Sequence, residues 1–214
     1  MSYAVKELFL TLQGEGVHAG RRAVFVRFAG CNLWSGLERD RTTAICQFCD
    51  TDFVGLDGEG GGRFDNADAL ATAVADKWGG DRESRFVVLT GGEPMLQVDQ
   101  ELIDALHDEG FYIAIESNGT LAVPRTIDWI CISPKANSET VQRSGDELKL
   151  VWPQEGSDWQ DMQGWSFANL LLQPKDAIGD PAASRAHIAQ AIAFVQAHPK
   201  WRLSLQNHKI LGLA

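Results

Sequence analysis

Short apolar runs alternate with longer segments of helical periodicity along most of the chain. Seven runs rich in aliphatic and aromatic residues predict strands at 23–28, 86–90, 111–115, 129–132, 147–151, 169–172 and 201–205. Nearly continuous apolar character over so few residues is typical of buried parallel strands. Between them, apolar residues spaced three or four positions apart predict helices at 66–78, 98–109 and 181–197. This alternation favours a parallel α/β fold.

The helix predicted at 181–197 has the clearest sequence signals. Asp180 is a suitable N-cap, and a proline follows it in the first turn. Ile188, Ile192 and Val195 recur at helical spacing, which indicates an apolar stripe on one side of this helix.

Polar clusters follow five of the predicted strands directly. They occupy 91–94, 116–119, 133–135, 173–176 and 206–209. In parallel α/β barrels the site is built from the loops at that end of the strands. Any one cluster could be an ordinary turn, since Gly, Pro, Asn and Ser dominate turns. Because all five lie at the same end, we expect them to surround one site.

Three of the four cysteines lie in one short stretch. Fourteen residues separate Cys31 from Cys46, and two separate Cys46 from Cys49. A structural zinc site takes four protein ligands, whereas three leave one coordination position open, and thiolate ligation also permits an iron–sulfur cluster. Cys31 follows the strand predicted at 23–28, so the cysteine loop should open on the same rim as the polar clusters. Cys131 lies in an apolar run and is interpreted as a buried small hydrophobe.

Length, charge and composition restrict the number of domains and the class of protein. The 214 residues suffice for one well-buried domain, predicted over 1–214, and no linker or repeat is visible. A formal charge of −10 argues against nucleic-acid binding, which needs a basic face. No apolar run approaches the length of about 20 residues that spans a bilayer. Since no signal peptide is visible either, we expect no membrane partner, no disulfide framework and a cytoplasmic location.

The cysteine triad, the aromatic Phe48 before its last member and the Gly-Gly-Glu-Pro segment 91–94 together resemble the radical S-adenosylmethionine (radical SAM) superfamily. The commonest triad of that superfamily has three residues between its first two cysteines, where this chain has fourteen. The resemblance implies an incomplete, TIM-like parallel barrel of about six βα units instead of the eight of a full barrel.

A longer pattern resembles one family within that superfamily, 7-carboxy-7-deazaguanine synthase, some members of which carry an expanded cysteine loop. The matching segments are 12–16, 27–34, 49–53, 90–94, 116–119, 133–135, 173–174 and 208–209. The likeness extends from about residue 3 to the C-terminus. It is weakest at 154–168 and 175–186, where loop composition is not diagnostic.

The resemblance implies which residues hold the cofactors. Cys31, Cys46 and Cys49 would bind three irons of a 4Fe-4S cluster, and the fourth iron would bind S-adenosylmethionine, whose cleavage gives a 5′-deoxyadenosyl radical. The cofactor carries the chemistry while the protein orients and shields it. The residues expected around S-adenosylmethionine are Phe48, Cys49, Asp50, Gly92, Ser133, Pro134, Lys135, Gln173, Pro174, Lys175 and Asp176.

The resemblance also implies the reaction, that of a carbon–nitrogen lyase in queuosine biosynthesis. The substrate would be 6-carboxy-5,6,7,8-tetrahydropterin, converted to 7-carboxy-7-deazaguanine by ring contraction and loss of ammonia. The guanidinium of Arg27 is planar and positively charged, so it can bind the carboxylate of the substrate through two hydrogen bonds. Expected substrate contacts are Leu12, Gln13, Gly14, Arg27, Thr90 and Ala214, with Glu116 and His208 as catalytic candidates. Thr51 matches the family's contact to Mg2+, an ion suited to oxygen ligands.

Each assignment has a plainer alternative. Arg27 could pair with a surface carboxylate, and Thr51 could cap a helix or occupy a turn. His208 could merely end a strand. Other candidates could be ordinary solvated side chains, namely the carboxylates Glu15, Glu93 and Glu116, and the loop or helix-surface histidines His18, His107, His187 and His198.

Two rival functions belong to other classes, and composition excludes neither. The first is a zinc-stabilised binding module, in which a histidine such as His18 joins the three cysteines. The second is an activase that places a radical on a partner protein. For the synthase, the expected partners are the pterin substrate, an external electron donor such as flavodoxin or ferredoxin, and a second copy of the chain that closes the open side of the barrel.

Overall fold

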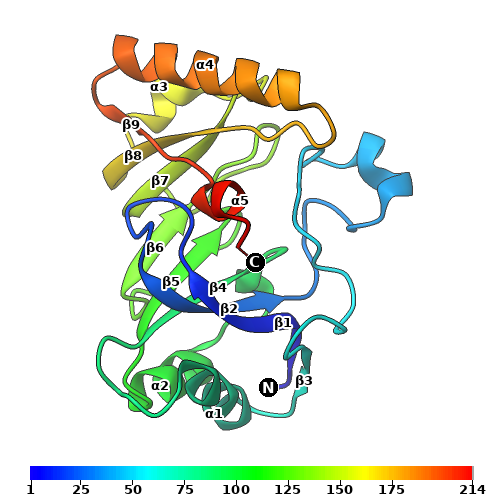
Figure 1. The fold of residues 1–214 in the computed structure, drawn as a ribbon, viewed down its shortest axis with the longest axis vertical. Helices are drawn as coiled ribbons and strands as arrows, with labels where there is room; N and C mark the ends of the chain where they lie inside the picture. The colour runs from blue at the N-terminus through cyan, green and yellow to red at the C-terminus, as the bar shows by residue number, and fades with distance from the viewer. Residues whose placement is uncertain (214) are drawn as a thin grey trace.

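A single curved sheet forms the centre of the molecule, described over residues 1–213 in a computed structural model (Figure 1). Its strand order is β3-β1-β2-β4-β5-β6-β7-β8-β9. The parallel strands are β2 (Arg22–Phe28), β4 (Phe86–Gly91), β5 (Tyr112–Ser117), β6 (Trp129–Ile132), β7 (Ser144–Trp152), β8 (Ser166–Pro174) and β9 (Trp201–Leu203). The two ends of this order, β3 and β9, do not pair with each other, so the sheet is an unclosed, partial barrel.

The predicted parallel barrel is confirmed, with seven parallel strands in the described chain where about six βα units were expected. Two antiparallel strands were missed. β1 (Tyr3–Leu12) pairs with β2, and β3 (Gly62–Phe64) pairs with β1. The segment of β1 mixes Lys6 and Glu7 with apolar residues, which hides the strand in the sequence. Its register shifts between Val5 and Glu7, so its side-chain alternation is also interrupted.

The helices lie outside the sheet. α1 (Ala67–Trp78) and α2 (Gln100–Asp108) lie together at one end in Figure 1, while α4 (Pro181–Ala197) lies along β8 and β9 at the other. The shorter elements are η1 (Glu38–Thr43), η2 (Pro94–Leu96), α3 (Trp159–Met162) and α5 (Asn207–Leu211). Asn66, Asp99 and Asp180 cap the three long helices, each accepting a backbone N–H bond in the first turn.

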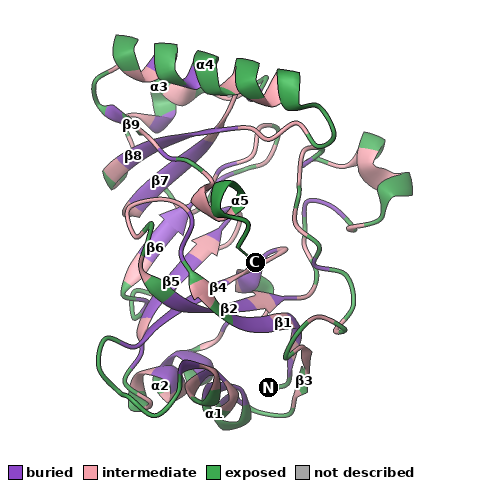
Figure 2. Ribbon diagram, viewed as in Figure 1, coloured by how far each residue is buried: buried purple, intermediate pink, exposed green. Residues whose placement is uncertain are grey.

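The predicted stripe on the helix at 181–197 is wrong in detail. Ile188 and Ile192 are 38% and 41% exposed, whereas Ala191 and Phe194 are buried. The Phe194 ring packs 4.8 Å from the Trp152 ring and 5.0 Å from the Trp159 ring. This aromatic cluster sets the rotation of α4 about its axis and leaves both isoleucines exposed. Much of the outer face of α4 is exposed, as Figure 2 shows.

The apolar core lies in two clusters along the sheet. The larger one joins β1, β2, β4, β5 and β6 to α1 and α2, and the smaller one joins β7, β8 and β9 to α4. Cys131 on β6 is 3% exposed and has a free thiol, as its apolar neighbours predict.

His18 lies in the turn after β1, so its interpretation as a loop residue is confirmed, although it is half-buried. Its ring packs 4.4 Å from that of Trp129 and 5.2 Å from that of Phe86, and its buried Nε2 has no hydrogen-bond partner. Burial lowers the pKa of this imidazole. Both aromatic rings belong to the first residues of their strands, so His18 lies at the opposite end of the sheet from the cysteine loop.

Asp99 ties the N-terminal strand to a helix, and its removal should destabilise the fold. Its carboxylate accepts hydrogen bonds from the Tyr3 hydroxyl at 2.7 Å and the Leu102 N–H at 3.0 Å. We expect Asp99→Ala to lower the free energy of unfolding by about 2 kcal/mol, because both buried donors lose their acceptor. Urea denaturation measures this. The exposed control Asp104→Ala on the same helix should change it by less than about 0.5 kcal/mol, and equal effects would contradict this role.

Candidate functional site

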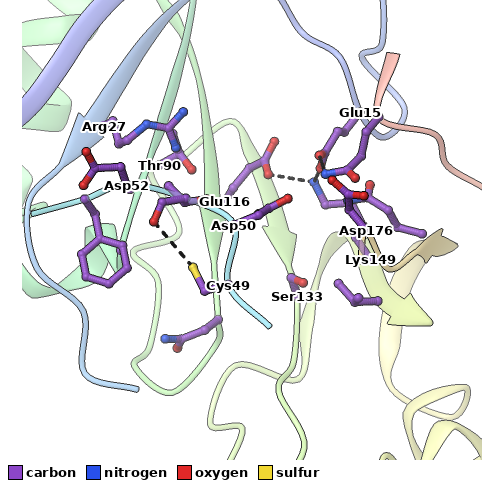
Figure 3. A pocket seen from close by; sticks show the side chains of 18 of the residues that line it. Glu15, Arg27, Cys49, Asp50, Asp52, Thr90, Glu116, Ser133, Lys149 and Asp176 are labelled. Atoms are coloured by element: carbon purple, nitrogen blue, oxygen red, sulfur yellow. Dashed lines mark hydrogen bonds and ion pairs between the residues drawn. The ribbon is translucent and has the colours of Figure 1, made fainter. Parts of the chain in front are cut away.

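A cavity of about 380 Å³ opens at the carboxyl ends of the parallel strands (Figure 3). The strands and their following loops bring four of the five predicted polar clusters into its wall, and the C-terminal segment contributes the fifth. Parallel pairing explains this convergence, because it places all the strands' carboxyl ends at one edge of the sheet.

Most of the predicted site residues line this one cavity. They are Leu12, Gln13, Gly14, Arg27, Cys31, Cys46, Phe48, Cys49, Asp50, Thr51, Thr90, Gly92, Glu116, Ser133, Lys135, Gln173, Pro174, Lys175, Asp176 and His208. Pro134 is buried and is not among its lining residues; its carbonyl accepts a bond from the Gln154 amide at 3.3 Å. Ala214 lies outside the described residues.

The three clustered cysteines face this cavity as free thiols. The Cys31 Sγ accepts a bond from the Leu33 N–H at 3.4 Å, and the Leu33 carbonyl accepts the Cys46 N–H at 3.3 Å. A hydrogen bond from the Cys46 thiol to Cys49 raises the pKa of Cys46 and lowers that of Cys49 to about 6. Burial raises the pKa of Cys31. Adjacent chain segments therefore hold the three sulfurs on one wall.

This donor set fits an iron–sulfur cluster better than a single zinc ion. In the part of the chain that the structure describes, no group of three or more His, Cys, Asp or Glu side chains is arranged to hold one metal ion. A cluster gives each cysteine its own iron, so its ligands need not converge on one point. The zinc-module alternative also loses its fourth ligand, because His18 packs against Trp129 at the far end of the sheet.

Gly92 allows the strand β4 to approach the cysteine loop. A Cβ at this position would overlap the Gly30 carbonyl oxygen and lie 2.8 Å from the Cβ of Cys31. The close approach expected at Gly92 therefore occurs, but its visible reason is backbone packing beside Cys31. A cofactor contact at Gly92 stays a prediction.

Lys149 is the functional candidate that sequence reasoning missed. It lies on β7 with a side chain only 4% exposed, and its Nζ is 2.6 Å from Glu15 Oε2 and 2.7 Å from Glu116 Oε2 (Figure 3). The Gln13 amide donates to Glu116 Oε1 at 2.8 Å, and the Gln206 amide donates to Glu15 Oε1 at 3.1 Å. A lysine inside an apolar strand was the available signal, of the same kind as Arg27 on β2.

The ion pairs of Lys149 determine the direction of the pKa shifts of Glu15 and of Lys149 itself. Burial alone would raise the pKa of Glu15, but the charge and hydrogen bond of Lys149 outweigh it and lower the pKa to about 2. Burial alone would lower the pKa of Lys149, and the two carboxylates raise it instead. Glu15 and Glu116 are consequently half-buried carboxylates that both pair with Lys149, and the solvated alternative is wrong for both.

Glu93 has a structural place and does not line the cavity. Its side chain is completely buried and accepts bonds from the Ser117 hydroxyl and the Asn118 and Met95 N–H groups, all at 2.8 to 2.9 Å. Burial raises the pKa of this carboxyl. Glu93 thus joins the turn after β4 to the end of β5, and its interpretation as a solvated carboxylate is wrong. A ligand contact of Glu93 stays a prediction.

Arg27 combines the functional and the plain interpretation. Its Nε donates to Glu7 Oε1 at 2.6 Å, yet the side chain lines the cavity near Thr90 (Figure 3). Nearby, the Thr51 carbonyl accepts a bond from Cys49 Sγ at 3.9 Å. Arg27 and Thr90 lie on one side of the cavity, while Glu15, Lys149 and Asp176 lie on the other.

The C-terminal helix α5 closes one side of the cavity. The Asn207 N–H donates to the Gly14 carbonyl at 2.9 Å, and a Cβ on Gly14 would overlap the ring of His208. Lys209 pairs with Asp50 and, at 2.7 Å, with Asp176. His208 therefore faces the cavity from a helix and does not end a strand, because β9 already ends at Leu203.

An unclosed parallel α/β barrel with three cysteines and convergent polar groups at its mouth defines an enzyme of the radical SAM class. Comparison with known proteins narrows the class. The chain is 58% identical to the 7-carboxy-7-deazaguanine synthase of Bradyrhizobium diazoefficiens and 55% identical to that of Caulobacter vibrioides, each over the full length of both proteins. The chain belongs to the 7-carboxy-7-deazaguanine synthase family.

A solved structure agrees with this assignment, although no family model matches the chain. The crystal structure of QueE from Escherichia coli superposes with a TM-score of 0.70 at 26% identity, covering 97% of this chain and 95% of that one. The activase alternative gains no support from these relatives.

The buried ion pairs predict a specific dependence of stability on pH. Lys149→Met leaves Glu15 and Glu116 unpaired and should cost about 3 to 5 kcal/mol at pH 7. In the wild type, the folded-state pKa of Glu15 lies below its ordinary value of 4.5, so its stabilisation exists above pH 4.5 and is lost as the pH falls towards about 2. The difference in the free energy of unfolding between wild type and Lys149→Met should therefore become smaller as the pH falls from 4.5 towards about 2.

Urea denaturation at a series of pH values measures this gap. Lys77→Met is the matched control, because Lys77 pairs with Glu59 at the surface and its loss should cost less than about 1 kcal/mol. A gap between Lys149→Met and wild type that stays constant from pH 7 to acid would show that Lys149 does not act through these carboxylates.

Proposed function

We propose that this protein is a 7-carboxy-7-deazaguanine synthase, which converts 6-carboxy-5,6,7,8-tetrahydropterin to 7-carboxy-7-deazaguanine and ammonia in queuosine biosynthesis. The observation that carries this proposal is the full-length relationship to enzymes of that name, up to 58% identity in the comparisons above. The convergence of the three cysteines and the strand-end polar groups on one cavity supports it.

Cys31, Cys46 and Cys49 would hold a 4Fe-4S cluster, with S-adenosylmethionine beside it. When bound, these groups supply the radical chemistry that starts the rearrangement. The protein's own contribution is placement. Lys135 Nζ donates to the Ser133 carbonyl at 2.8 Å and to its hydroxyl at 2.7 Å, which gives this cofactor-facing turn a defined shape.

Asp50 and Phe48 are the proposed contacts to the nucleoside part of S-adenosylmethionine. Asp50 is held by Lys209 from α5, so its carboxylate is oriented before the ribose hydroxyls arrive. Phe48 offers an aromatic face to the adenine, and Lys175 Nζ lies 5.9 Å from the centre of its ring. Gln173, Pro174 and Asp176 complete the wall from the end of β8.

The substrate carboxylate would bind Arg27. Glu7 holds the Nε of this guanidinium, which fixes its plane and leaves the terminal nitrogens for a bidentate contact. Thr90 and the 12–14 backbone offer donors and acceptors to the aminopyrimidone ring from the same cavity. Thr51 would contribute an oxygen ligand to Mg2+, with substrate and water oxygens completing the shell.

Glu116 and His208 are the groups proposed to act on the substrate. Lys149 Nζ lies 2.7 Å from Glu116 Oε2 and the Gln13 amide donates to Oε1 at 2.8 Å, so the carboxylate of Glu116 is held in one orientation at the wall of the cavity. His208 faces the cavity beside Gly14, where an imidazole can donate or accept at physiological pH.

The electron donor is proposed to be an external reductase such as flavodoxin or ferredoxin. None of the helices described is long and apolar enough to cross a membrane. A cytoplasmic location is part of the proposal.

A homodimer is proposed from the apolar surface near the C-terminus. Ile210 and Leu211 on α5 are 70% and 64% exposed, and Leu10 and Leu12 on β1 are 41% and 39% exposed. Such exposure of several large aliphatic side chains from two elements is typical of an interface. The proposed partner would cover this surface beside the open side of the barrel.

The dimer is tested by light scattering. Wild-type protein should elute as a dimer, and Leu211→Glu should shift it to the monomer because a buried unpaired charge opposes association. Leu37→Glu serves as a control, since Leu37 is 37% exposed in the cysteine loop, away from α5. A purely monomeric wild type would contradict the proposal.

The activity is tested by an anaerobic assay. Reconstituted protein, reductant, S-adenosylmethionine and the tetrahydropterin should yield the deazaguanine product and ammonia. Cys49→Ala should lose both bound iron and product, because one of three thiolate ligands is removed. Cys131→Ala should keep both, since its thiol is buried on β6 outside the cavity. If reconstituted wild-type protein binds iron but forms no deazaguanine, the proposed synthase activity is wrong.

A further inference from the structure

The expanded cysteine loop contains an arginine that no assignment above uses. Residues 32–45 separate Cys31 from Cys46, and the short helix η1 projects from the body of the molecule at the right of Figure 1. None of the residues of η1 is buried. A segment with so little burial needs specific polar contacts to keep one conformation.

Arg41 supplies such contacts. One of its terminal nitrogens, Nη1, donates to the Gln47 carbonyl and the Cys49 carbonyl, each at 3.0 Å. Its Nε donates to Glu38 Oε1 at 2.6 Å. The side chain is only 23% exposed, although it comes from an exposed helix. A single guanidinium thus closes the turn that contains two of the three clustered thiols.

Trp34 fixes the plane of that guanidinium. The Arg41 guanidinium carbon lies 4.1 Å from the centre of the indole ring, in a cation–π contact. The indole is 7% exposed, packs edge-on against Phe53 at 5.6 Å and donates its N–H to the Leu37 carbonyl at 3.2 Å. Trp34 therefore anchors Arg41 to the body of the protein on the Cys31 side of the loop.

These contacts connect the two halves of the cysteine motif. Trp34 follows Cys31 by three positions, and the carbonyls that Arg41 binds flank Phe48 and belong to the Cys46–Cys49 turn. Fourteen intervening residues leave the relative position of the two halves undefined unless tertiary contacts determine it. The guanidinium is one group that touches both halves.

We propose that Arg41 is a positioning residue that places Cys46 and Cys49 relative to Cys31 and adds a positive charge beside the bound cluster. The inference rests on the proposed function, because it needs the cluster to be bound. A planar, permanently charged fork suits the task, since it lies flat on the Trp34 indole while Nη1 binds the two carbonyls and Nε binds Glu38. The compact ammonium of lysine has no plane to stack and no second nitrogen for Glu38. Groups that orient metal ligands change metal affinity about 10- to 100-fold when removed.

Three variants separate the effect of Arg41 on the position of the cysteines from the effect of its positive charge. Arg41→Met removes the charge and both carbonyl contacts. Arg41→Lys keeps the charge but removes the planar guanidinium that stacks on Trp34 and binds Glu38 through its Nε. Arg39→Met removes a 79%-exposed arginine from the same helix. After anaerobic reconstitution, the rate of cluster loss to an iron chelator and the midpoint potential of the cluster are measured. Circular dichroism of each apoprotein checks folding.

We expect Arg41→Met to lose its cluster about tenfold faster than wild type. Its midpoint potential should be more negative, because a nearby cation stabilises the more negatively charged reduced cluster. Arg41→Lys should lose its cluster faster than wild type while keeping the wild-type potential. Arg39→Met should match wild type in both measurements.

The proposal is overturned if Arg41→Met matches Arg39→Met in either measurement. If the Arg41→Met apoprotein does not fold, Arg41→Lys tests the proposal instead. The proposal is then overturned if Arg41→Lys loses its cluster at the wild-type rate. A wild type that takes up neither iron nor sulfide refutes the proposed function itself, and with it the role of Arg41. The two failures are therefore distinguishable.

Discussion

Parallel pairing of seven neighbouring strands is the constraint on which the rest of the molecule depends. Since parallel strands end at the same edge, the loops after β2, β4, β5, β6 and β8 and the last residues of β7 are brought to one mouth although they are far apart in the chain. The antiparallel strand β1 adds its own end to that mouth through residues 12–15. One cavity therefore collects cysteines, carboxylates, a lysine and an arginine in a chain of net charge −10.

Collecting charged groups in a partly buried cavity has a cost, which the structure offsets by pairing them. Lys149 lies between Glu15 and Glu116, Arg27 pairs with Glu7, and Lys209 bridges Asp50 and Asp176. Each pair joins different segments of the chain, so the contacts that give these charged groups a partner also connect the N-terminal turn, the cysteine loop and α5. Binding residues and stabilising residues are consequently the same residues at this site.

In the cysteine loop, different contacts bring together residues that are distant in the sequence. Its ordering relies on backbone carbonyls, one guanidinium and one indole, with little apolar burial. Gly92 contributes from the opposite side, because the absence of a side chain lets β4 approach Cys31. A loop built in this way tolerates a long insertion as long as the contacts at its base are kept.

Local pattern by itself determined the seven parallel strands, the three long helices with the Asp180 cap, the buried state of Cys131 and the polar clusters at strand ends, because periodicity and capping are properties of neighbouring residues. It did not determine the antiparallel strands β1 and β3. The motifs also identified most of the residues that line the cavity. Only the tertiary structure decided which charges pair. Lys149 was not singled out in the sequence, Glu93 belonged to the 91–94 segment, and His18 was a candidate zinc ligand. Their burial and partners became visible only in the structure, because packing sets both. The same holds for α4, whose rotation follows from Phe194 meeting tryptophans contributed by distant segments.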